Sequence, residues 1–234
     1  MNIRKLKKIK RIFWISIFVL AFGSSFFWNH ENMSLISLNK IIKNDPCFWN
    51  QTEGVRKNGP LLQFLNNIDI KTMNEQPNYS KQEMIILTKK YQNVASKYNQ
   101  SRKNNISNQN IIFNLSESFA DPRRVPGVSI SSNPIPLIDF IKSNTTSGLM
   151  MSSGYGGGTA NMEYMTLTGL ATCNFAPTMS TPYTQLVPNQ KYVHTFINNF
   201  NYSIAIHPYK SDFYNRRSDY KKFGFNKFLC LDSK

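Results

Sequence analysis

The sequence predicts an α/β domain in its second half, because two short apolar runs flank a glycine-rich loop. Residues 111–115 (IIFNL) end at Ser116 and Glu117, and residues 202–206 (YSIAI) end at His207. Apolar runs bounded by polar residues are typical of buried strands in an α/β sheet, and ligands bind beyond the carboxyl ends of such strands. We therefore expect two strands that deliver polar side chains to one site.

The loop between these runs contains three consecutive glycines, at 156–158, followed directly by Thr159. Glycine permits tight backbone geometry and close approach of a ligand, and residues 160–167 suit a helix. Thr159 would then stand at a helix N-terminus, where N–H groups and the helix dipole favour negative charge on a phosphate or on an ionising hydroxyl. The alternative is that Thr159 only caps the helix. A Walker loop is excluded because its Gly-Lys-Ser/Thr sequence is missing.

The start of the chain predicts a membrane anchor. Residues 1–11 contain six basic residues and no acidic one, whereas residues 12–28 carry no charge. As a transmembrane helix rising roughly 1.5 Å per residue, the uncharged segment would cross a thin bilayer. The positive-inside rule then leaves the basic tail in the cytoplasm and everything after Trp28 outside the cell. A signal peptide cleaved near Ser25 is the alternative, but the aromatic residues that continue the apolar run favour an uncleaved anchor.

Residues 29–108 predict an extracellular helical connector. They are rich in Asn, Lys and Gln, and apolar residues recur at helical spacing only in three patches, at 35–42, 59–67 and 79–98. Ser80 can cap the last of these helices. Residues 99–108 have no apolar periodicity, so we expect the catalytic domain to span residues 109–234.

The charge and the cysteines limit the partners. The formal net charge is +15, and +9 remains after the six basic residues of the tail are removed. Outside the cell, this charge suits anionic lipid or polymer better than nucleic acid. Cys47, Cys173 and Cys230 are odd in number and widely spaced, so a zinc or redox motif is not expected and they act as small apolar residues.

Three segments together resemble the lipoteichoic acid synthase (phosphoglycerol transferase) family, within the alkaline phosphatase/sulfatase-like superfamily. They read NIIFNLSESFADPRRVPGV, SSGYGGGTANMEYMTLTGL and AIHPYKSDFYNRRSDYKKFGF. The resemblance runs from about Asn110 to the C-terminus, and three motifs in the family's order are more specific than any one of them. It implies a sulfatase-like sheet flanked by helices, here incomplete, after the membrane helix and the connector.

The resemblance also implies a reaction and a site. Glycerol phosphate would pass from phosphatidylglycerol to a growing polyglycerolphosphate (lipoteichoic acid) chain at the outer face of the cell membrane. Thr159 would be the nucleophile and would carry the covalent intermediate. Glu117 and Thr159 would bind one divalent ion, Mn²⁺ or Mg²⁺, which suits the chemistry because such an ion offsets phosphoryl charge. His207, Tyr214 and Arg216 would line the glycerol phosphate pocket.

Two of these pocket residues have simpler alternatives. The guanidinium of Arg216 can hold a phosphate by two parallel hydrogen bonds, but the basic run RRSDYKK around it could be a solvated surface. Tyr214 stands where some family members have Trp, and it could serve only in packing.

The chain departs from the family at its end. The family completes its metal site with an Asp-His pair, and its pocket with another His, from later in the domain, and neither occurs here. We therefore expect an N-terminal portion of such an enzyme, without turnover by itself. One alternative is a catalytically dead, membrane-anchored fragment that binds anionic polymer through Arg216 and its basic neighbours. Another is a sulfatase or phosphatase that releases its product to water.

Overall fold

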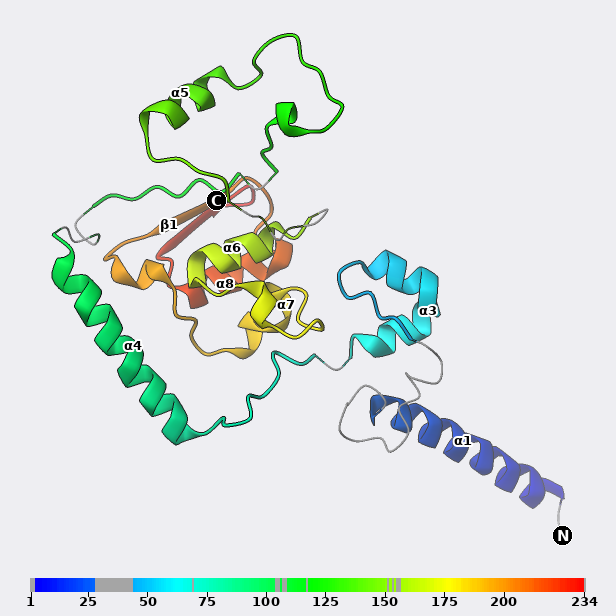
Figure 1. Cartoon of the computed structure of the whole chain (residues 1–234). Coiled ribbons are helices and arrows are strands. Elements are labelled where there is room, and N and C mark those ends of the chain that lie inside the picture. The colour runs from blue at the N-terminus through cyan, green and yellow to red at the C-terminus, as the bar shows by residue number, and fades with distance from the viewer. Residues whose placement is uncertain are drawn as a thin grey trace. The chain divides into compact units, whose positions relative to one another are not determined.

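The structure is a computed structural model, and it describes residues 3–27, 44–68, 70–103, 106, 109–116, 118–150, 152, 154 and 157–233. Figure 1 shows the whole chain, coloured from the N-terminus to the C-terminus. The chain divides into two compact units. The first unit comprises Met1–Pro77 and Cys173–Ser180, and the second comprises Asn78–Thr172 and Thr181–Lys234. The division predicted from the sequence, with boundaries at 11, 28 and 108, stays a prediction.

The first described helix of the first unit is α1 (Ile3–Phe27), which includes the six basic residues of the tail and most of the uncharged segment. Within the described residues, no helix is both long enough and apolar enough to cross a membrane. The transmembrane prediction for residues 12–28 is therefore not confirmed, and its last residue, Trp28, lies outside the described residues. The helix predicted at 35–42 also lies outside them.

The next described helix of this unit, α3 (Gln51–Asn66), includes most of the helix predicted at 59–67. It begins after Asn50, whose side-chain oxygen accepts a hydrogen bond from the Glu53 backbone N–H (3.1 Å). Gly59 has φ +76°, and the helix kinks there because Pro60 follows.

Buried amides rather than apolar side chains hold the end of α3. Gln63 is 2 % exposed, and its Nε2 donates to the Pro46 carbonyl (2.7 Å). The side chains of Asn66 and Asn44 exchange two hydrogen bonds, of 2.6 and 3.0 Å. Cys47 is buried, as expected for a small apolar residue, whereas Cys173 is exposed, so the same expectation is wrong for Cys173.

The second unit starts with α4 (Lys81–Ser101), the helix predicted at 79–98. Its cap is Ser80, which accepts a hydrogen bond from the Glu83 backbone N–H (3.1 Å). The later elements, in chain order, are η2 (Pro122–Arg124), α5 (Pro136–Asn144), α6 (Thr159–Thr168), η3 (Thr172–Asn174, at the boundary of the units), α7 (Pro182–Gln185), η4 (Val187–Asn189), η5 (Phe196–Asn199), β1 (Ile204–His207), η6 (Phe213–Asn215), α8 (Arg216–Phe223) and β2 (Lys227–Cys230).

The sheet that the structure describes has two parallel strands. β1 pairs with β2 so that Ile204 lies opposite Lys227 and His207 opposite Cys230. The prediction of a strand ending at His207 is confirmed. The prediction of a strand at 111–115 is wrong for the described residues, because this segment joins no ladder.

Residues 111–115 have strand propensity because they are apolar, but an apolar run does not itself supply a neighbouring strand with which to pair. Ile112 is 93 % exposed. Phe113 instead packs on Phe196, with ring centroids 4.6 Å apart.

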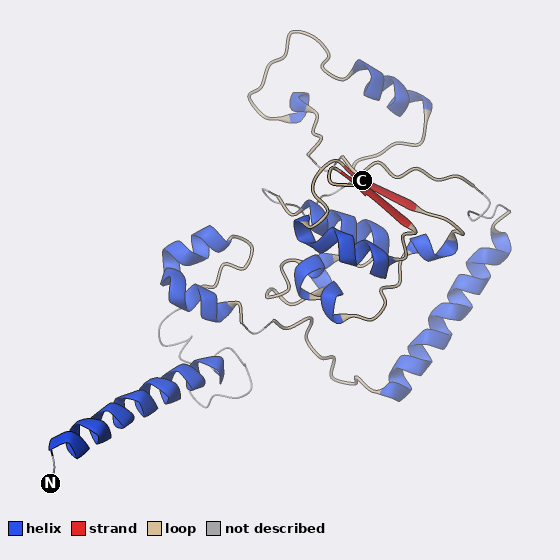
Figure 2. Ribbon diagram, turned by 180° about the vertical axis from the view of Figure 1, so that it is seen from behind, coloured by secondary structure: helices blue, strands red, loops and turns tan. Residues whose placement is uncertain are grey.

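Aromatic rings form the core of the second unit, where α6, α7 and α8 gather beside the two strands (Figure 2). Tyr164 and Tyr183 each meet the ring of Phe223, with centroids 6.4 and 5.3 Å apart. Tyr220 faces the sheet and lies 4.8 Å from Phe228 of β2. Burial of such rings and their edge-to-face contacts fix α8 between the other helices and the sheet.

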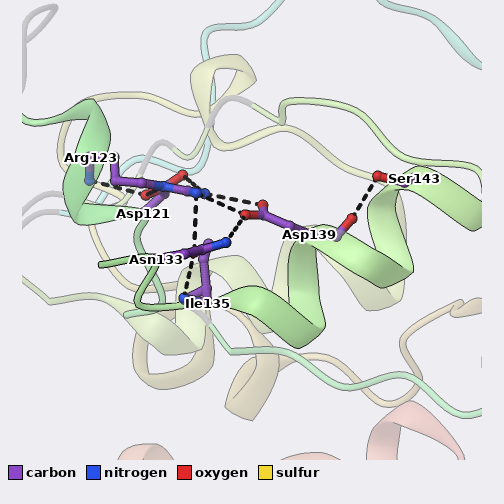
Figure 3. Close-up of polar contacts among 6 residues, drawn as sticks. All are labelled: Asp121, Arg123, Asn133, Ile135, Asp139 and Ser143. Atoms are coloured by element: carbon purple, nitrogen blue, oxygen red, sulfur yellow. Dashed lines mark hydrogen bonds and ion pairs between the residues drawn. The ribbon is translucent and has the colours of Figure 1, made fainter. Parts of the chain in front are cut away.

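A separate ion-pair cluster stabilises the segment 121–144, which contains η2 and α5 (Figure 3). Arg123 binds both oxygens of Asp121 (2.8 and 2.7 Å) and both oxygens of Asp139 (2.8 and 3.1 Å). Asn133 donates to Asp139 (2.9 Å). Arg123, followed by Asn133, lowers the pKa of Asp139 to about 2. Because the pKa of Asp139 is lower in the folded chain, the ionised carboxyl stabilises the fold at pH values above the ordinary carboxyl pKa of about 4. This stabilisation is lost as the pH falls through about 2.

We predict that Arg123→Ala loosens the segment 121–139, because one guanidinium joins carboxylates that are 18 residues apart in sequence, at Asp121 and Asp139. Amide hydrogen exchange of residues 121–144 should rise in Arg123→Ala at pH 7. Arg124→Ala is the matched control, since it removes an adjacent and exposed arginine. Equal exchange in the two variants would contradict the role of the cluster.

Candidate functional site

A cavity of about 740 Å³ lies in the second unit. Its lining includes Thr159 and Glu163 of α6, His207 of β1, and the serines Ser116 and Ser118. The structure therefore brings together two of the predicted site residues, Thr159 and His207. Glu117, the predicted metal ligand, lies outside the described residues, although both of its neighbours in sequence line the cavity.

Thr159 is the first residue of α6, as the sequence predicts. The N-cap is Gly158, whose φ of +84° is a left-handed conformation that glycine adopts without a steric penalty. Its carbonyl accepts the Asn161 N–H (2.7 Å). The alternative that Thr159 is the cap is therefore wrong, and its hydroxyl instead lies in the first turn, where the helix dipole favours negative charge.

His207 ends β1 at the cavity. Burial, and then the positive charge of Arg216, lower the pKa of its imidazole. The ring is therefore neutral at neutral pH. Its Nδ1 is buried and has no hydrogen-bond partner among the described residues. A neutral imidazole of this kind can accept or donate one hydrogen bond to a hydroxyl or phosphoryl oxygen of a ligand.

Arg216 is placed differently from the prediction. Its side chain is 1 % exposed and is not part of the cavity lining. Nε and Nη2 donate to the two carboxylate oxygens of Glu163 (2.9 and 2.8 Å), and Nη1 donates to the Phe213 carbonyl (3.0 Å). The idea of a solvated basic surface is thus wrong for Arg216. The pair of guanidinium N–H groups that the sequence analysis expects to bind phosphate binds the Glu163 carboxylate instead.

Tyr214 also lies outside the cavity lining, and its ring covers Arg216. The ring centroid is 5.4 Å from the guanidinium carbon of Arg216. Tyr214 and Asn215 both have left-handed backbone angles, with φ of +57° and +58°. For residues with a Cβ this conformation costs about 1 kcal/mol or more, less for Asn. The strained pair turns the chain immediately before α8, and Arg216 enters the core at that turn.

Glu163 is the residue of this site that the sequence did not reveal. Besides its two bonds to Arg216, its carboxylate accepts hydrogen bonds from the hydroxyls of Tyr183 (3.1 Å) and Tyr220 (3.0 Å). Burial and then the negative charge of Glu163 raise the pKa of both tyrosines, which keeps them as donors. The only signal available was its spacing, four residues after Thr159, which puts both on one face of a helix.

A second polar cluster fixes the loop after β1. Ser211 donates to Asp232 through its backbone N–H and its hydroxyl (both 2.8 Å). Arg217 donates to the same carboxylate (3.1 Å). The hydrogen bonds from Ser211 lower the pKa of Asp232. The segment that leads from His207 to Arg216 is therefore tied to the end of β2.

The described residues of the site provide too few ligands for the predicted metal ion. The described residues contain no group of three or more His, Cys, Asp or Glu side chains that could hold a metal. Glu163 already accepts four hydrogen bonds, which leaves it poorly suited as a ligand. The described residues alone thus do not fit a divalent ion.

The cavity combines the threonine that begins α6 with the histidine that ends β1. Residues 109–232 match the sulfatase family, and the chain belongs to that family.

Comparison with individual proteins gives two matches in addition to the family. The structure of the Streptococcus pyogenes phosphoglycerol transferase GacH in complex with sn-glycerol-1-phosphate is 42 % identical, with a TM-score of 0.66 over 70 % of this chain and 43 % of that one. A Rhizobium meliloti (strain 1021) protein, whose name proposes cyclic beta-1,2-glucan modification, is 32 % identical over 205 residues. That match covers 86 % of this chain and 30 % of the relative, so the chain spans less than half of either protein.

One buried acid on α8 gives a prediction for the pH dependence of stability. Asp219 is fully buried, its Oδ2 has no partner among the described residues, and burial raises its pKa to about 6. A raised carboxyl pKa means that the folded state binds the proton more tightly, so stability falls as the pH rises from about 4 to about 6.

We predict that Asp219→Asn is more stable than the original chain at pH 7, by at most about 3 kcal/mol, from roughly 1.4 kcal/mol per pKa unit. The two proteins should unfold most nearly alike near pH 3, below the ordinary carboxyl pKa of about 4, where the acid is largely protonated in both the folded and the unfolded state. Urea unfolding at pH 3, 5 and 7 measures this difference. A difference that does not change with pH would show that Asp219 is not the titrating group.

Proposed function

We propose that this chain is part of a phosphoglycerol transferase that takes glycerol phosphate from phosphatidylglycerol. The observation that carries the proposal is the position of Thr159 at the start of α6, in one cavity with His207. The likeness to a phosphoglycerol transferase solved with sn-glycerol-1-phosphate supports this choice of substrate within the sulfatase family.

The proposed reaction has two displacements at phosphorus. The Thr159 oxygen attacks the phosphodiester, the bond from phosphorus to the diacylglycerol oxygen breaks, and that oxygen takes up a proton as the threonine loses one. An acceptor hydroxyl then attacks the glycerophosphoryl-threonine and loses its proton, the bond from phosphorus to the Thr159 oxygen breaks, and that oxygen takes up a proton. The α6 N-terminus stabilises the ionised hydroxyl, and neutral His207 offers a hydrogen bond to the glycerol phosphate.

The proposal also includes a divalent ion, a membrane location and an acceptor. A divalent ion, Mn²⁺ or Mg²⁺, would offset charge on the phosphoryl oxygens, and Glu117 and Thr159 are the residues proposed to hold it. The outward membrane location is proposed from the basic tail and the uncharged segment after it. The acceptor is proposed to be a polyglycerolphosphate chain, and the name of the Rhizobium relative makes a glucan hydroxyl the alternative.

Hydrolysis is the second candidate, because the family match is to sulfatases. In that case water replaces the acceptor in the second displacement, and the first displacement is the same. Free glycerol phosphate, rather than a glycerophosphoryl acceptor, would then accumulate when the enzyme is supplied with phosphatidylglycerol, polyglycerolphosphate and glucan.

We predict that Thr159→Ala abolishes formation of the glycerophosphoryl adduct, whereas Thr166→Ala retains it. Thr166 is the matched control, because it lies on α6 and lines the same cavity but is two turns from the helix N-terminus. The assay scores one covalent transfer and therefore does not require turnover. The intact mass of the chain is measured after incubation with phosphatidylglycerol vesicles and Mn²⁺.

Both variants should keep the thermal stability of the original chain within about 1 kcal/mol, because neither threonine is the N-cap. An adduct on Thr159→Ala would refute the assignment of the nucleophile. Absence of any adduct from the folded original chain would count against the proposed function itself.

A further inference from the structure

We propose that Glu163 is a positioning residue, which holds Arg216 in a fixed place relative to Thr159. This inference rests on the proposed function, because it gives Arg216 its predicted role in binding glycerol phosphate. It adds a residue to which the sequence assigned no role. Glu163 also connects the two helices that carry the site, α6 and α8.

The geometry of the pair is that of a fixed support. Glu163 lies one turn after Thr159 on α6 and binds Arg216, at the start of α8, through two parallel hydrogen bonds of 2.9 and 2.8 Å. A bidentate carboxylate–guanidinium pair constrains orientation as well as distance. The Tyr183 and Tyr220 hydroxyls hold the carboxylate from two further sides, at 3.1 and 3.0 Å. The carboxylate therefore has little freedom to turn, and neither does the arginine.

Burial makes this support necessary. Arg216 is 1 % exposed and Glu163 is 12 % exposed as side chains. A buried guanidinium without a carboxylate partner is strongly unfavourable, and the side chain would have to leave the core to regain water. Without Glu163, Arg216 would therefore lose the position that it now keeps over Phe213 and Tyr214.

Arg216 keeps donors for a ligand while it is held. Its bonds to described residues use the Nε hydrogen and one hydrogen on each terminal nitrogen. One hydrogen on each terminal nitrogen remains for a phosphate oxygen. Of the three aromatic rings around the guanidinium, Tyr214 is the nearest, at 5.4 Å. Ligand contact thus requires these rings to shift, while Glu163 keeps the arginine in place.

The test is a double-mutant cycle on the 234-residue chain, with sn-glycerol-1-phosphate titrated by calorimetry. Glu163→Gln should weaken binding at least tenfold, and Arg216→Gln should weaken it at least as much. If Glu163 acts through Arg216, the double variant should bind no worse than Arg216→Gln alone. The double variant also removes both charges together, so it avoids leaving one buried charge without a partner.

Two controls separate positioning from general destabilisation. Glu83→Gln makes the same substitution in the first turn of α4, and it should bind like the original chain. Tyr220→Phe removes one hydrogen bond to Glu163 but keeps the ion pair, so binding should weaken less than in Glu163→Gln. Thermal unfolding of each variant reports whether it folds, and a Glu163→Gln chain that fails to fold leaves Tyr220→Phe and the double variant to decide.

The outcomes are distinguishable. Binding by the original chain with equal binding by Glu163→Gln would overturn the positioning role and leave the proposed function standing. Additive losses in the cycle would also overturn it, because Glu163 would then act independently of Arg216. No binding by the folded original chain would overturn the proposed function, and this inference with it.

Discussion

The buried ion pair between Glu163 and Arg216 is the interaction on which the second unit depends. It joins the helix that begins at the cavity to the helix that follows the strained turn, and two tyrosines of the aromatic core complete it. Such a pair adds little net stability compared with apolar residues of the same volume, because desolvation of both charges offsets their attraction. Its value here is specificity, since three of the four hydrogen bonds join α6 to α8 and the fourth, from Tyr183, joins α6 to α7.

The same constraint explains the backbone strain before α8. Arg216 enters the core only because the chain reverses within Tyr214 and Asn215, both in the left-handed region. The loop is held from its other side by the bonds of Ser211 to Asp232. Strain of about 1 kcal/mol or more per residue persists when the surroundings over-determine the conformation, as these two anchors do.

Features of the structure that depend on neighbouring residues follow from the sequence, whereas features that depend on distant residues do not. The start of α6 at Thr159, the Ser80 cap of α4 and the strand that ends at His207 follow from glycine, capping and apolar patterns, which act within a few residues. The partner of Glu163 lies 53 residues away and depends on tertiary packing, so no pattern near Glu163 indicates it.

The predictions that are wrong also concern features that depend on distant residues. The run at 111–115 has strand character but joins no ladder in the described residues, whereas β2 is only four residues long and was missed. The sequence predicts that Arg216 binds phosphate, but a sequence cannot show whether a guanidinium faces a ligand or a carboxylate of its own protein.

The charge balance of the cavity follows from this arrangement. Among the described residues that line the cavity, none is Lys or Arg, and Glu163 is the one carboxylate. Arg216 lies behind the lining, where Glu163 balances its charge, and His207 is neutral because burial and Arg216 lower its pKa. The positive potential that an anionic phosphoryl group meets in this part of the molecule thus comes mainly from the N-terminus of α6, equivalent to roughly half a unit charge. Half a unit charge favours an anion only weakly by itself. Firm binding of a phosphodiester would therefore depend on the two Arg216 hydrogens that the described residues leave unused, which is the reason that the position of this guanidinium matters.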